Sequence, residues 1–335
     1  MRLERLSLSE WGSALPSDGF EPFHAPEALS VLDAYTDAEM HLLGGFKGQQ
    51  PVALLPLFDR SSSVGSVLGS PLPGSGAGRL GPILMPTSPK RSKYEKINRT
   101  FAELVVDETG ADARSTLFRM VCNVDYPDPR PYTWEGFDVE TSWTYRLAVD
   151  EPADALLQAA SKSLRREITD ARDLDVTVGR EGLEGARAVY DETRRRYAEQ
   201  GRQLSTSWPY VRDLVEEMQA DDRARVYVAR DDRGRFLTGV TVLYSNDAGY
   251  YWQGGTRTVH EGVALNSLVH WKVVEDIAED PPRESVTTYD LLGANTERLC
   301  RYKSKFGSEL TPYYVVESSG PGMAAAKKAY ELVAR

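Results

Sequence analysis

The two halves of the chain repeat one order of predicted elements, and this repeat limits the folds that the sequence allows. A strand hairpin predicted at residues 40–60 precedes a long amphipathic helix, and a hairpin at residues 224–246 precedes another, at residues 263–279. Each half then ends in an aromatic segment, a glycine and a strand, at residues 132–149 and 301–316. Hairpins that alternate with helices build sheets covered by helices. The repeat therefore predicts an α/β protein of two tandem domains, each a mixed, largely antiparallel sheet flanked by helices.

The boundary between the repeats lies near residue 150. The length of 335 residues suits two medium-sized domains. We therefore expect a first domain over residues 1–150 and a second over residues 151–320. Residues 321–335 form a predicted helix that has no counterpart in the first half, and we expect this helix to pack on the first domain.

The charge of the chain narrows the classes of function. A formal net charge of -10 argues against general nucleic-acid binding through a basic face, so an anionic ligand would have to be held locally. An acidic excess with arginine well above lysine suits either a protein that works at high salt or an ordinary acidic cytosolic protein. The two cysteines, Cys122 and Cys300, show no metal-ligand spacing and are expected to be reduced thiols.

The apolar segments are too short to cross a membrane. The longest stretches, such as Val52–Phe58, fall well short of a bilayer span, and this one contains Pro56. The first residues alternate charged and apolar side chains and lack the apolar core of a signal peptide. We expect a soluble, cytoplasmic protein without a membrane span.

Several catalytic chemistries lack their motifs. The four histidines show no metal-ligand spacing, so no metal site is expected, and neither a GxSxG elbow nor a GxxxxGK[ST] loop occurs. The glycine-rich residues 74–81 are predicted to be a plain surface loop rather than a phosphate-binding loop. His270 is interpreted as a packed residue and Cys300 as a small buried side chain, rather than as a base and a nucleophile.

The strongest candidate site lies at residues 287–309. A predicted strand breaks at Gly293-Ala294-Asn295 and continues as a short helix that carries Tyr302, Lys303 and Lys305. Lysine supplies only ten of the 40 lysine and arginine residues, so two in one tripeptide favour a cationic site. The alternative is a surface helix whose lysines interact with its C-terminal dipole. Lys303 is the candidate catalytic residue, and Tyr302, Lys305 and Asn295 are the candidate substrate contacts.

Other candidate residues have a structural alternative of their own. Asp290, at the end of the predicted strand, is a candidate proton acceptor or a hydrogen-bond partner of the next loop. Tyr251 and Trp252 would line a cleft or belong to the core. Arg196 would bind an anionic acceptor or make ion pairs along its helix.

These segments resemble the Fem-type (FemAB-like) aminoacyltransferases and the related two-domain GNAT acyltransferases. The resemblance covers most of the chain, through PFHAPEAL, SLRREI, YYWQGGT and GVALNSLVHW, and YDLLGAN with YKSKFG is its most specific part. It implies tandem GNAT-like domains and transfer of an acyl or aminoacyl group to an amine that attacks directly. It also implies that Lys303 contacts the activated donor or the charge that develops during transfer.

The chain departs from the GNAT pattern where coenzyme A pyrophosphate would bind. The usual Arg/Gln-x-x-Gly-x-Gly/Ala loop is here His260 to Ala264, which keeps Gly262 and Ala264 and lacks the leading cation. Together with Asn266, Gly262 and Ala264 are the candidate cofactor-binding residues, at a helix expected to begin near Gly262. The long coiled-coil insertion of the staphylococcal-type members is missing.

The resemblance leaves the donor and the acceptor open. The donor would be acyl-CoA or aminoacyl-tRNA, neither tightly bound, and the acceptor an amine of a small molecule or a cell-envelope precursor. One alternative is a coenzyme A-dependent N-acetyltransferase of a small molecule or an amino sugar. Another is a non-catalytic binding protein with the GNAT fold. We predict an acyltransferase with its donor site in the second domain.

Overall fold

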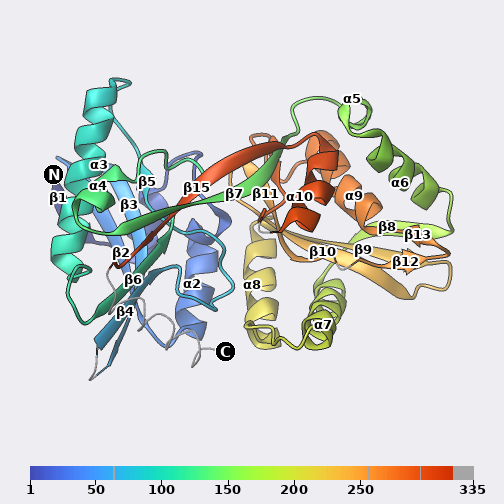
Figure 1. Ribbon diagram of the computed structural model, residues 1–335, viewed down its shortest axis with the longest axis horizontal. Helices are drawn as coiled ribbons and strands as arrows, with labels where there is room; N and C mark the ends of the chain where they lie inside the picture. The colour runs from blue at the N-terminus through green and yellow to red at the C-terminus, as the bar shows by residue number, and fades with distance from the viewer. Residues whose placement is uncertain (63–64, 256, 295, 320–335) are drawn as a thin grey trace. The chain divides into compact units, whose positions relative to one another are not determined.

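The computed structural model describes residues 1–62, 65–255, 257–294 and 296–319 (Figure 1). The described chain divides into two compact units, one of Met1–Ser142 with residues 312–319, and one of Trp143–Thr311. We call them unit 1 and unit 2. The helix predicted at residues 321–335 lies outside the described residues. In the part of the chain that is described, no helix combines the length and the apolar character needed to span a membrane.

Unit 1 is built on a sheet with the strand order β1-β2-β3-β4-β6-β15, antiparallel except for the parallel pair β4–β6. A short strand, β5, pairs with β3. The strands are β1 (Arg2–Arg5), β2 (Glu39–Lys47), β3 (Gln50–Ser62), β4 (Gly65–Ser70), β5 (Ile83–Leu84), β6 (Thr116–Val121) and β15 (Glu309–Glu317). The helices are α1 (Leu8–Ala14), η1 (Pro22–His24), α2 (Pro26–Tyr35), α3 (Arg91–Thr109) and α4 (Arg130–Trp134).

Local sequence signals fix the helix ends of unit 1. Ser7 and Glu10 form a capping box at the start of α1, in which each side chain bonds the other's backbone N–H. Gly110 ends α3 with φ 60°, a left-handed conformation that glycine adopts without strain. The apolar face of α3 places Phe101 and Val105 in a core shared with β3 and β6.

Unit 2 contains a sheet with the order β7-β14-β11-β10-β9-β8, again antiparallel except for one parallel pair, β11–β14. A separate hairpin joins β12 and β13. The strands are β7 (Asp138–Ala148), β8 (Val176–Glu181), β9 (Ala224–Asp231), β10 (Phe236–Tyr244), β11 (Ala248–Gly254), β12 (Val259–His260), β13 (Val263–Ala264) and β14 (Thr288–Asp290). The helices are α5 (Ala153–Ala159), α6 (Lys162–Arg172), α7 (Leu183–Glu199), α8 (Trp208–Ala220), α9 (Asn266–Glu279), α10 (Glu297–Lys303) and η2 (Ser304–Phe306).

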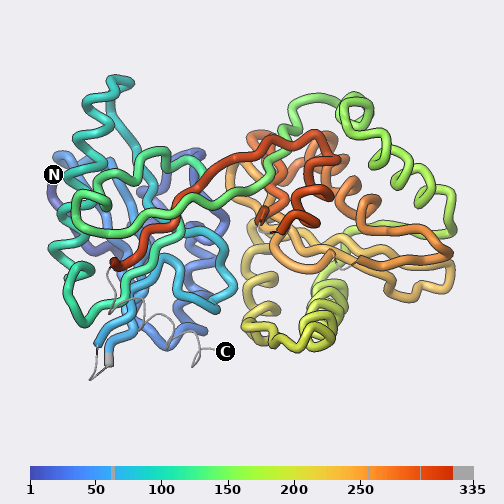
Figure 2. The backbone as a smooth tube through the Cα atoms, viewed as in Figure 1, coloured from blue at the N-terminus to red at the C-terminus, as the bar shows by residue number. Residues whose placement is uncertain are grey.

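The two sheets repeat one topology but exchange their terminal strands. In each unit, three antiparallel strands lead to a parallel pair, β4–β6 or β11–β14. The strand beyond that pair comes from the other half of the sequence: β15 pairs with β6, with Val315 opposite Val121, and β7 pairs with β14, with Leu147 opposite Tyr289. Figure 2 shows the chain leaving unit 1 along β7 and returning along β15.

This exchange explains why the unit boundaries differ from the predicted 1–150 and 151–320. The chain passes into unit 2 at Trp143, within β7, and back into unit 1 at Pro312, within β15. Alternating side chains predict a strand but not the sheet that the strand joins. The predicted fold class, tandem α/β domains with mixed, largely antiparallel sheets flanked by helices, is confirmed.

Two predicted helices have different bounds in the structure. The apolar spacing over residues 153–174 predicts a single helix. The structure divides this segment into α5 and α6, because Ser161 is in an extended conformation and caps α6 by accepting a hydrogen bond from the Leu164 N–H at 3.2 Å. The helix expected to begin near Gly262 begins at Asn266, since Gly262 lies instead in the turn of the β12–β13 hairpin.

The glycine-rich loop of unit 1 is buried in its second half, where a surface loop was predicted. Arg79 is 3% exposed and donates two hydrogen bonds to Glu21, which is 2% exposed, at 2.8 and 3.1 Å. Because the two charges form an ion pair, burying them together costs less free energy than burying one of them alone. Gly81 lies against the backbone of Cys122, where an added Cβ would come within 2.5 Å of the Cys122 Cα.

Candidate functional site

The candidate site of unit 2 lies where its two parallel strands separate. β11 and β14 are paired from Ala248 and Thr288 to Tyr250 and Asp290, after which β14 ends and β11 continues. The carboxyl ends of parallel strands are the usual place for ligands in open α/β sheets. The chain after β14 turns through residues 291–294 and enters α10, which Thr296 caps.

Lys303, at the end of α10, turns back onto the loop that precedes this helix. Its side chain is 4% exposed, and its ammonium donates hydrogen bonds to the carbonyl oxygens of Leu292 and, at 2.7 Å, Gly293. The same ammonium lies 5.8 Å from the centre of the Tyr251 ring on β11. Burial lowers the pKa of Lys303 to about 8, although the charge of Asp290 favours the protonated form. Lys303 therefore ties the end of β14 to β11.

Asp290 is fully buried and holds the same turn from the other side. Its Oδ1 accepts hydrogen bonds from the Thr144 hydroxyl at 2.5 Å and from the Leu292 N–H at 2.8 Å. Leu292 and Gly293 have φ of 45° and 69°, an unusual conformation for leucine. Lys303 and Asp290 thus fix both polar groups of Leu292, its carbonyl and its N–H.

An open pocket lies beside this buried group, within unit 2. Its volume is about 590 Å³, within the range of small-molecule sites. It is lined by Glu167, Gly255, Arg257, Ala264, Asn266, Ser267, Arg298, Leu299, Arg301, Tyr302 and Lys305. Four of these side chains are cationic and one is a carboxylate. The pocket therefore favours an anionic ligand even though the whole chain is acidic.

Glu167 organises one wall of the pocket. From α6, its carboxylate accepts hydrogen bonds from the Lys305 ammonium at 2.6 Å and from the Ser267 hydroxyl at 2.7 Å. The Tyr302 hydroxyl lies beside Ser267, is buried, and completes no hydrogen bond of good geometry with the described residues. Burial raises the pKa of Tyr302, so its hydroxyl is a neutral donor near the pocket.

The amino end of α9 forms another wall. Asn266 and Ser267 are its first residues, and the preceding Leu265 gives the helix no side-chain cap. The Asn266 side chain is engaged by its own loop, because it accepts from the Thr258 N–H at 3.0 Å and donates to the Gly255 carbonyl at 2.6 Å. The helix therefore presents its positive end to the pocket, as anion-binding helices do.

His270 lies behind the pocket, on α9. It is 2% exposed, and its Nδ1 is 2.8 Å from the Tyr289 hydroxyl. Its ring meets the Tyr251 ring edge-on at 4.6 Å. Burial and the neighbouring charge of Lys303 lower the pKa of His270 to about 3, so the ring is neutral and belongs to the core.

The structure brings together some of the predicted site residues and separates others. Tyr302, Lys305, Ala264 and Asn266 line the pocket, while Lys303, Asp290 and Tyr251 form the buried group beside it. The remaining predictions fall elsewhere. Gly262, at φ 84°, is exposed in the hairpin turn; Trp252 packs against Tyr210; and Asn295 lies outside the described residues.

Arg196 lies at the margin of this site. It makes ion pairs with Glu192 and Glu199 on its own helix, α7, at 3.4 and 3.2 Å, as the structural alternative proposed. It also donates to the backbone carbonyl of Arg257 at 3.0 Å, and Arg257 lines the pocket. Arg196 therefore supports a pocket residue through the backbone.

Sequence reasoning missed seven of the lining residues, and five of these carry polar or charged side chains: Glu167, Arg257, Ser267, Arg298 and Arg301. The spacing of Arg298 and Arg301 on α10, three residues apart, was a usable signal, since such residues share a helix face. Glu167 had no such signal, because its partners are 100 and 138 residues away in the sequence.

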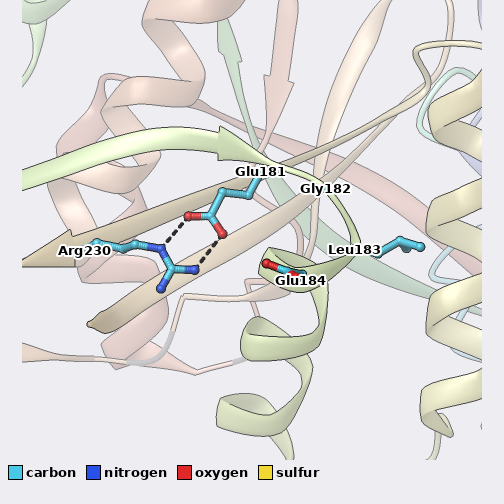
Figure 3. A pocket seen from close by; sticks show the side chains of 5 residues that line it. All are labelled: Glu181, Gly182, Leu183, Glu184 and Arg230. Carbon is cyan, nitrogen blue, oxygen red and sulfur yellow. Dashed lines mark hydrogen bonds and ion pairs between the residues drawn. The ribbon is translucent and has the colours of Figure 1, made fainter. Parts of the chain in front are cut away.

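A second hollow, of about 640 Å³, lies at the start of α7 and is lined by Glu181, Gly182, Leu183, Glu184 and Arg230 (Figure 3). Glu181 and Arg230 face each other there, and the guanidinium donates two hydrogen bonds to the carboxylate, at 2.7 and 2.8 Å. Leu183 points away from this pair. The Glu181–Arg230 pair satisfies its own charges, so the pocket at α9 remains the candidate functional site.

Comparisons with known proteins concern the fold of the chain. Residues 158–304 match the family model described as "Acetyltransferase (GNAT) domain". The crystal structure of FemX superposes with a TM-score of 0.71 and 12% identity over 100% of both chains. No curated protein sequence matches the chain significantly.

Two further solved structures share the two-unit architecture. A tandem GNAT protein from the clavulanic acid biosynthesis pathway has a TM-score of 0.52 and 13% identity, over 96% of this chain and 99% of its own. L-PGS from Bacillus licheniformis has a TM-score of 0.53 and 12% identity, over 95% of this chain and 99% of its own. At such identities the likeness concerns the fold.

Proposed function

We propose that this chain, which has the tandem GNAT fold of the Fem-type two-domain acyltransferases, transfers an activated acyl or aminoacyl group from a phosphate-bearing donor to an amine. The observation that carries the proposal is the cationic pocket at the amino end of α9. Helix amino ends and arginine side chains are the groups with which proteins most often hold phosphate.

The pocket contains cationic side chains that are available to bind such a ligand. Arg301 is paired with Glu297 at 2.9 Å and Lys305 with Glu167 at 2.6 Å. Neither Arg257 nor Arg298 makes an ion pair with a residue in the described part of the chain. These two guanidinium groups are therefore the main candidates for the donor's phosphate groups.

The chemistry needs little beyond this arrangement. The acceptor amine attacks the donor carbonyl, a carbon–nitrogen bond forms, and the bond to the thiol or the ribose hydroxyl breaks. The amine loses its proton, and the leaving group takes one up. Negative charge on the carbonyl oxygen is favoured at the positive end of α9 and beside Lys305.

Lys303 serves this proposal as a positioning residue. Its ammonium is bonded to the carbonyl oxygens of Leu292 and Gly293, and it fixes the loop from which α10 starts. α10 in turn carries Arg298, Arg301 and Tyr302 into the pocket wall. We therefore assign Lys303 to the support of the donor site.

The decisive experiment compares the two donor classes directly. Titration calorimetry with acetyl-coenzyme A, and filter binding with aminoacyl-tRNA, would identify the donor that binds. The double variant Arg257→Gln/Arg298→Gln should weaken that donor by about tenfold or more, because two charge-assisted phosphate contacts are lost. Arg166→Gln is the matched control, since Arg166 is 83% exposed on α6 and lies outside the pocket lining.

Turnover would then be measured with a panel of amines, by release of free thiol or of deacylated tRNA. Transfer from one donor, lost in the double variant and kept in Arg166→Gln, is the expected result. Absence of binding by both donors would refute the proposal. Binding without turnover across the panel would favour a non-catalytic protein of this fold.

A further inference from the structure

A separate cationic pocket lies in unit 1, at the start of α3. Its volume is about 260 Å³, and it is lined by Met1, Lys47, Thr87, Ser88, Lys93, Lys96, Ile97 and Thr100. Lys47 ends β2, and Lys93, Lys96 and Thr100 lie along one face of α3. Three ammonium groups and three hydroxyls thus border one small hollow, the lysine pocket, whose described lining includes no carboxylate.

The charges of α3 are divided between two faces. On one face Arg91 pairs with Glu95 at 3.0 Å and Arg99 with Glu103 at 2.7 Å, in steps of four residues. Lys93 and Lys96 project from the opposite side, because residues two and five positions after Arg91 are rotated by about 200° and 140° around a helix of 3.6 residues per turn. The glutamates of this helix therefore neutralise the arginines and leave the lysines uncompensated.

The lysines of the pocket have no internal counter-charge. The side chains of Lys47, Lys93 and Lys96 make no ion pair or hydrogen bond with any residue in the described ranges of the chain. Lysine is scarce in this chain, ten of 335 residues, and the formal net charge is -10. Three like charges at one hollow repel each other, and a bound anion would relieve that repulsion.

The start of α3 adds to the positive potential. This helix of 19 residues has Lys90 as its N-cap, with no side-chain cap hydrogen bond. The uncapped amino end carries a partial positive charge, and it lies next to Ser88 in the pocket lining. The helix end and the three ammonium groups therefore act on the same small volume.

We propose that the lysine pocket binds a compact, phosphate-bearing anion. Ammonium groups bind phosphate as point charges, and a dianion meets three of them better than a single carboxylate does. The volume is below the range of about 300–1,000 Å³ that drug-sized ligands occupy. One phosphate group, free or at the end of a small molecule, fits this size, whereas an extended polyanion would need a continuous basic surface.

This site shares no lining residue with the donor pocket, because its lining belongs to unit 1 and that of the donor pocket to unit 2. The test can therefore use the unmodified chain and a readout other than activity. Lysine acetylation by a water-soluble active ester, followed by mass spectrometry, gives a rate for each lysine. The rates are compared in sodium phosphate and in sodium chloride of equal ionic strength.

Phosphate should slow the acetylation of Lys47, Lys93 and Lys96 by roughly threefold or more, because a bound dianion shields and stabilises the ammonium form. Lys162, in unit 2 and outside the linings of both pockets, is the internal control and should not change. Lys305 reports the donor pocket separately, so the two sites are distinguished in one experiment.

Titration calorimetry with inorganic phosphate and with a small phosphomonoester gives the second measurement. Lys93→Gln/Lys96→Gln should weaken binding by about tenfold, as expected for the loss of two charge-assisted contacts. Lys162→Gln/Arg166→Gln, on α6 of unit 2 and with the same change in net charge, should leave it unchanged. Equal slowing at every lysine would overturn the proposal, and so would protection by single-stranded RNA but not by phosphate.

Discussion

The Lys303 ammonium donates a hydrogen bond to the Gly293 carbonyl oxygen at 2.7 Å, so the last residue of α10 fixes the loop from which this helix starts. The loop cannot change its conformation without leaving that ammonium buried and unpaired, which is expensive. Because Arg298 and Tyr302 lie on α10, the geometry of the pocket depends on this hydrogen bond.

The first prediction concerns the removal of this ammonium. Lys303→Met should lower the free energy of unfolding by about 1–3 kcal/mol at pH 7, because the carbonyls of Leu292 and Gly293 lose their buried donor. Lys305→Met is the matched control, and it should cost about 1 kcal/mol or less, since its ion pair with Glu167 is partly exposed. Urea unfolding of both variants tests this, and equal losses would contradict it.

The second prediction is a rise in stability between pH 8 and pH 9.5. Burial lowers the pKa of Lys303 to about 8 in the folded chain, against about 10.4 in the unfolded chain. In this interval the unfolded chain binds more protons, so the free energy of unfolding increases with pH, by at most about 1.4 kcal/mol per pH unit. The increase should be absent in Lys303→Met. A parallel pH dependence of wild type and variant would exclude Lys303 as its source.

The third prediction concerns acid. Burial and the Lys303 charge lower the pKa of His270 to about 3, below the unfolded value of about 6.5. The stability that neutral His270 contributes is complete above pH 6.5 and is lost as the pH falls towards 3. His270→Gln should therefore flatten the loss of stability between pH 6.5 and pH 4.5.

His24 contributes in the same direction and must be controlled for. Burial lowers the pKa of His24 to about 4, and this residue belongs to unit 1. The pH dependence that remains in His270→Gln should therefore be removed by adding His24→Gln. If the double variant loses stability with falling pH as the wild type does, carboxylates rather than these histidines cause that loss.

The fourth prediction is that removing the charge of one pocket residue strengthens donor binding. Among the residues that the structure describes, Glu167 is the one carboxylate that lines the donor pocket, where it bonds Lys305 and Ser267. Glu167→Gln keeps the shape and removes the negative charge, so it should tighten binding of an anionic donor by roughly threefold, because one charge in a water-exposed pocket is worth about 1 kcal/mol or less. Weaker binding would mean that the carboxylate is needed to place Lys305.

The fifth prediction tests the buried ion pair of unit 1. Arg79→Met and Glu21→Gln should each cost about 3–5 kcal/mol, because each leaves one buried charge without its partner. The double variant should be more stable than the sum of the two losses predicts. Thermal unfolding of the three variants measures this coupling, and additive losses would argue against a paired role.

Sequence reasoning predicted the elements and part of the pocket. Scarce lysines beside a strand-loop-helix segment indicated Tyr302 and Lys305, and both line the pocket. Periodicity could not show that Lys303 is 4% exposed while Lys305, two residues later, faces the pocket. That difference depends on the conformation of Leu292, whose φ of 45° no residue pattern predicts.

The parts of the site that the sequence did not predict depend on contacts between segments that are far apart in the sequence. Glu167 joins the pocket only because α6 packs against α9, and this packing is a property of the whole unit. The amino end of α9 was expected four residues too early, since Gly262 was interpreted as a helix start and lies in a hairpin turn. Glycine is compatible with a helix start and with a hairpin turn, so the local sequence did not distinguish these two structures at Gly262.

The exchange of terminal strands also sets the order in which a growing chain can become complete. Residues 1–142 leave the ribosome first, yet β6 lacks its β15 partner until Val315–Glu317 have been made. By then all of residues 143–311 have been synthesised, and β14 already has β7 beside it. The parallel pair of unit 2 can therefore gain its neighbouring strand before that of unit 1 does, against the usual order of domain folding during translation. Until β15 pairs with it, β6 presents an open edge on which a neighbouring nascent chain could pair.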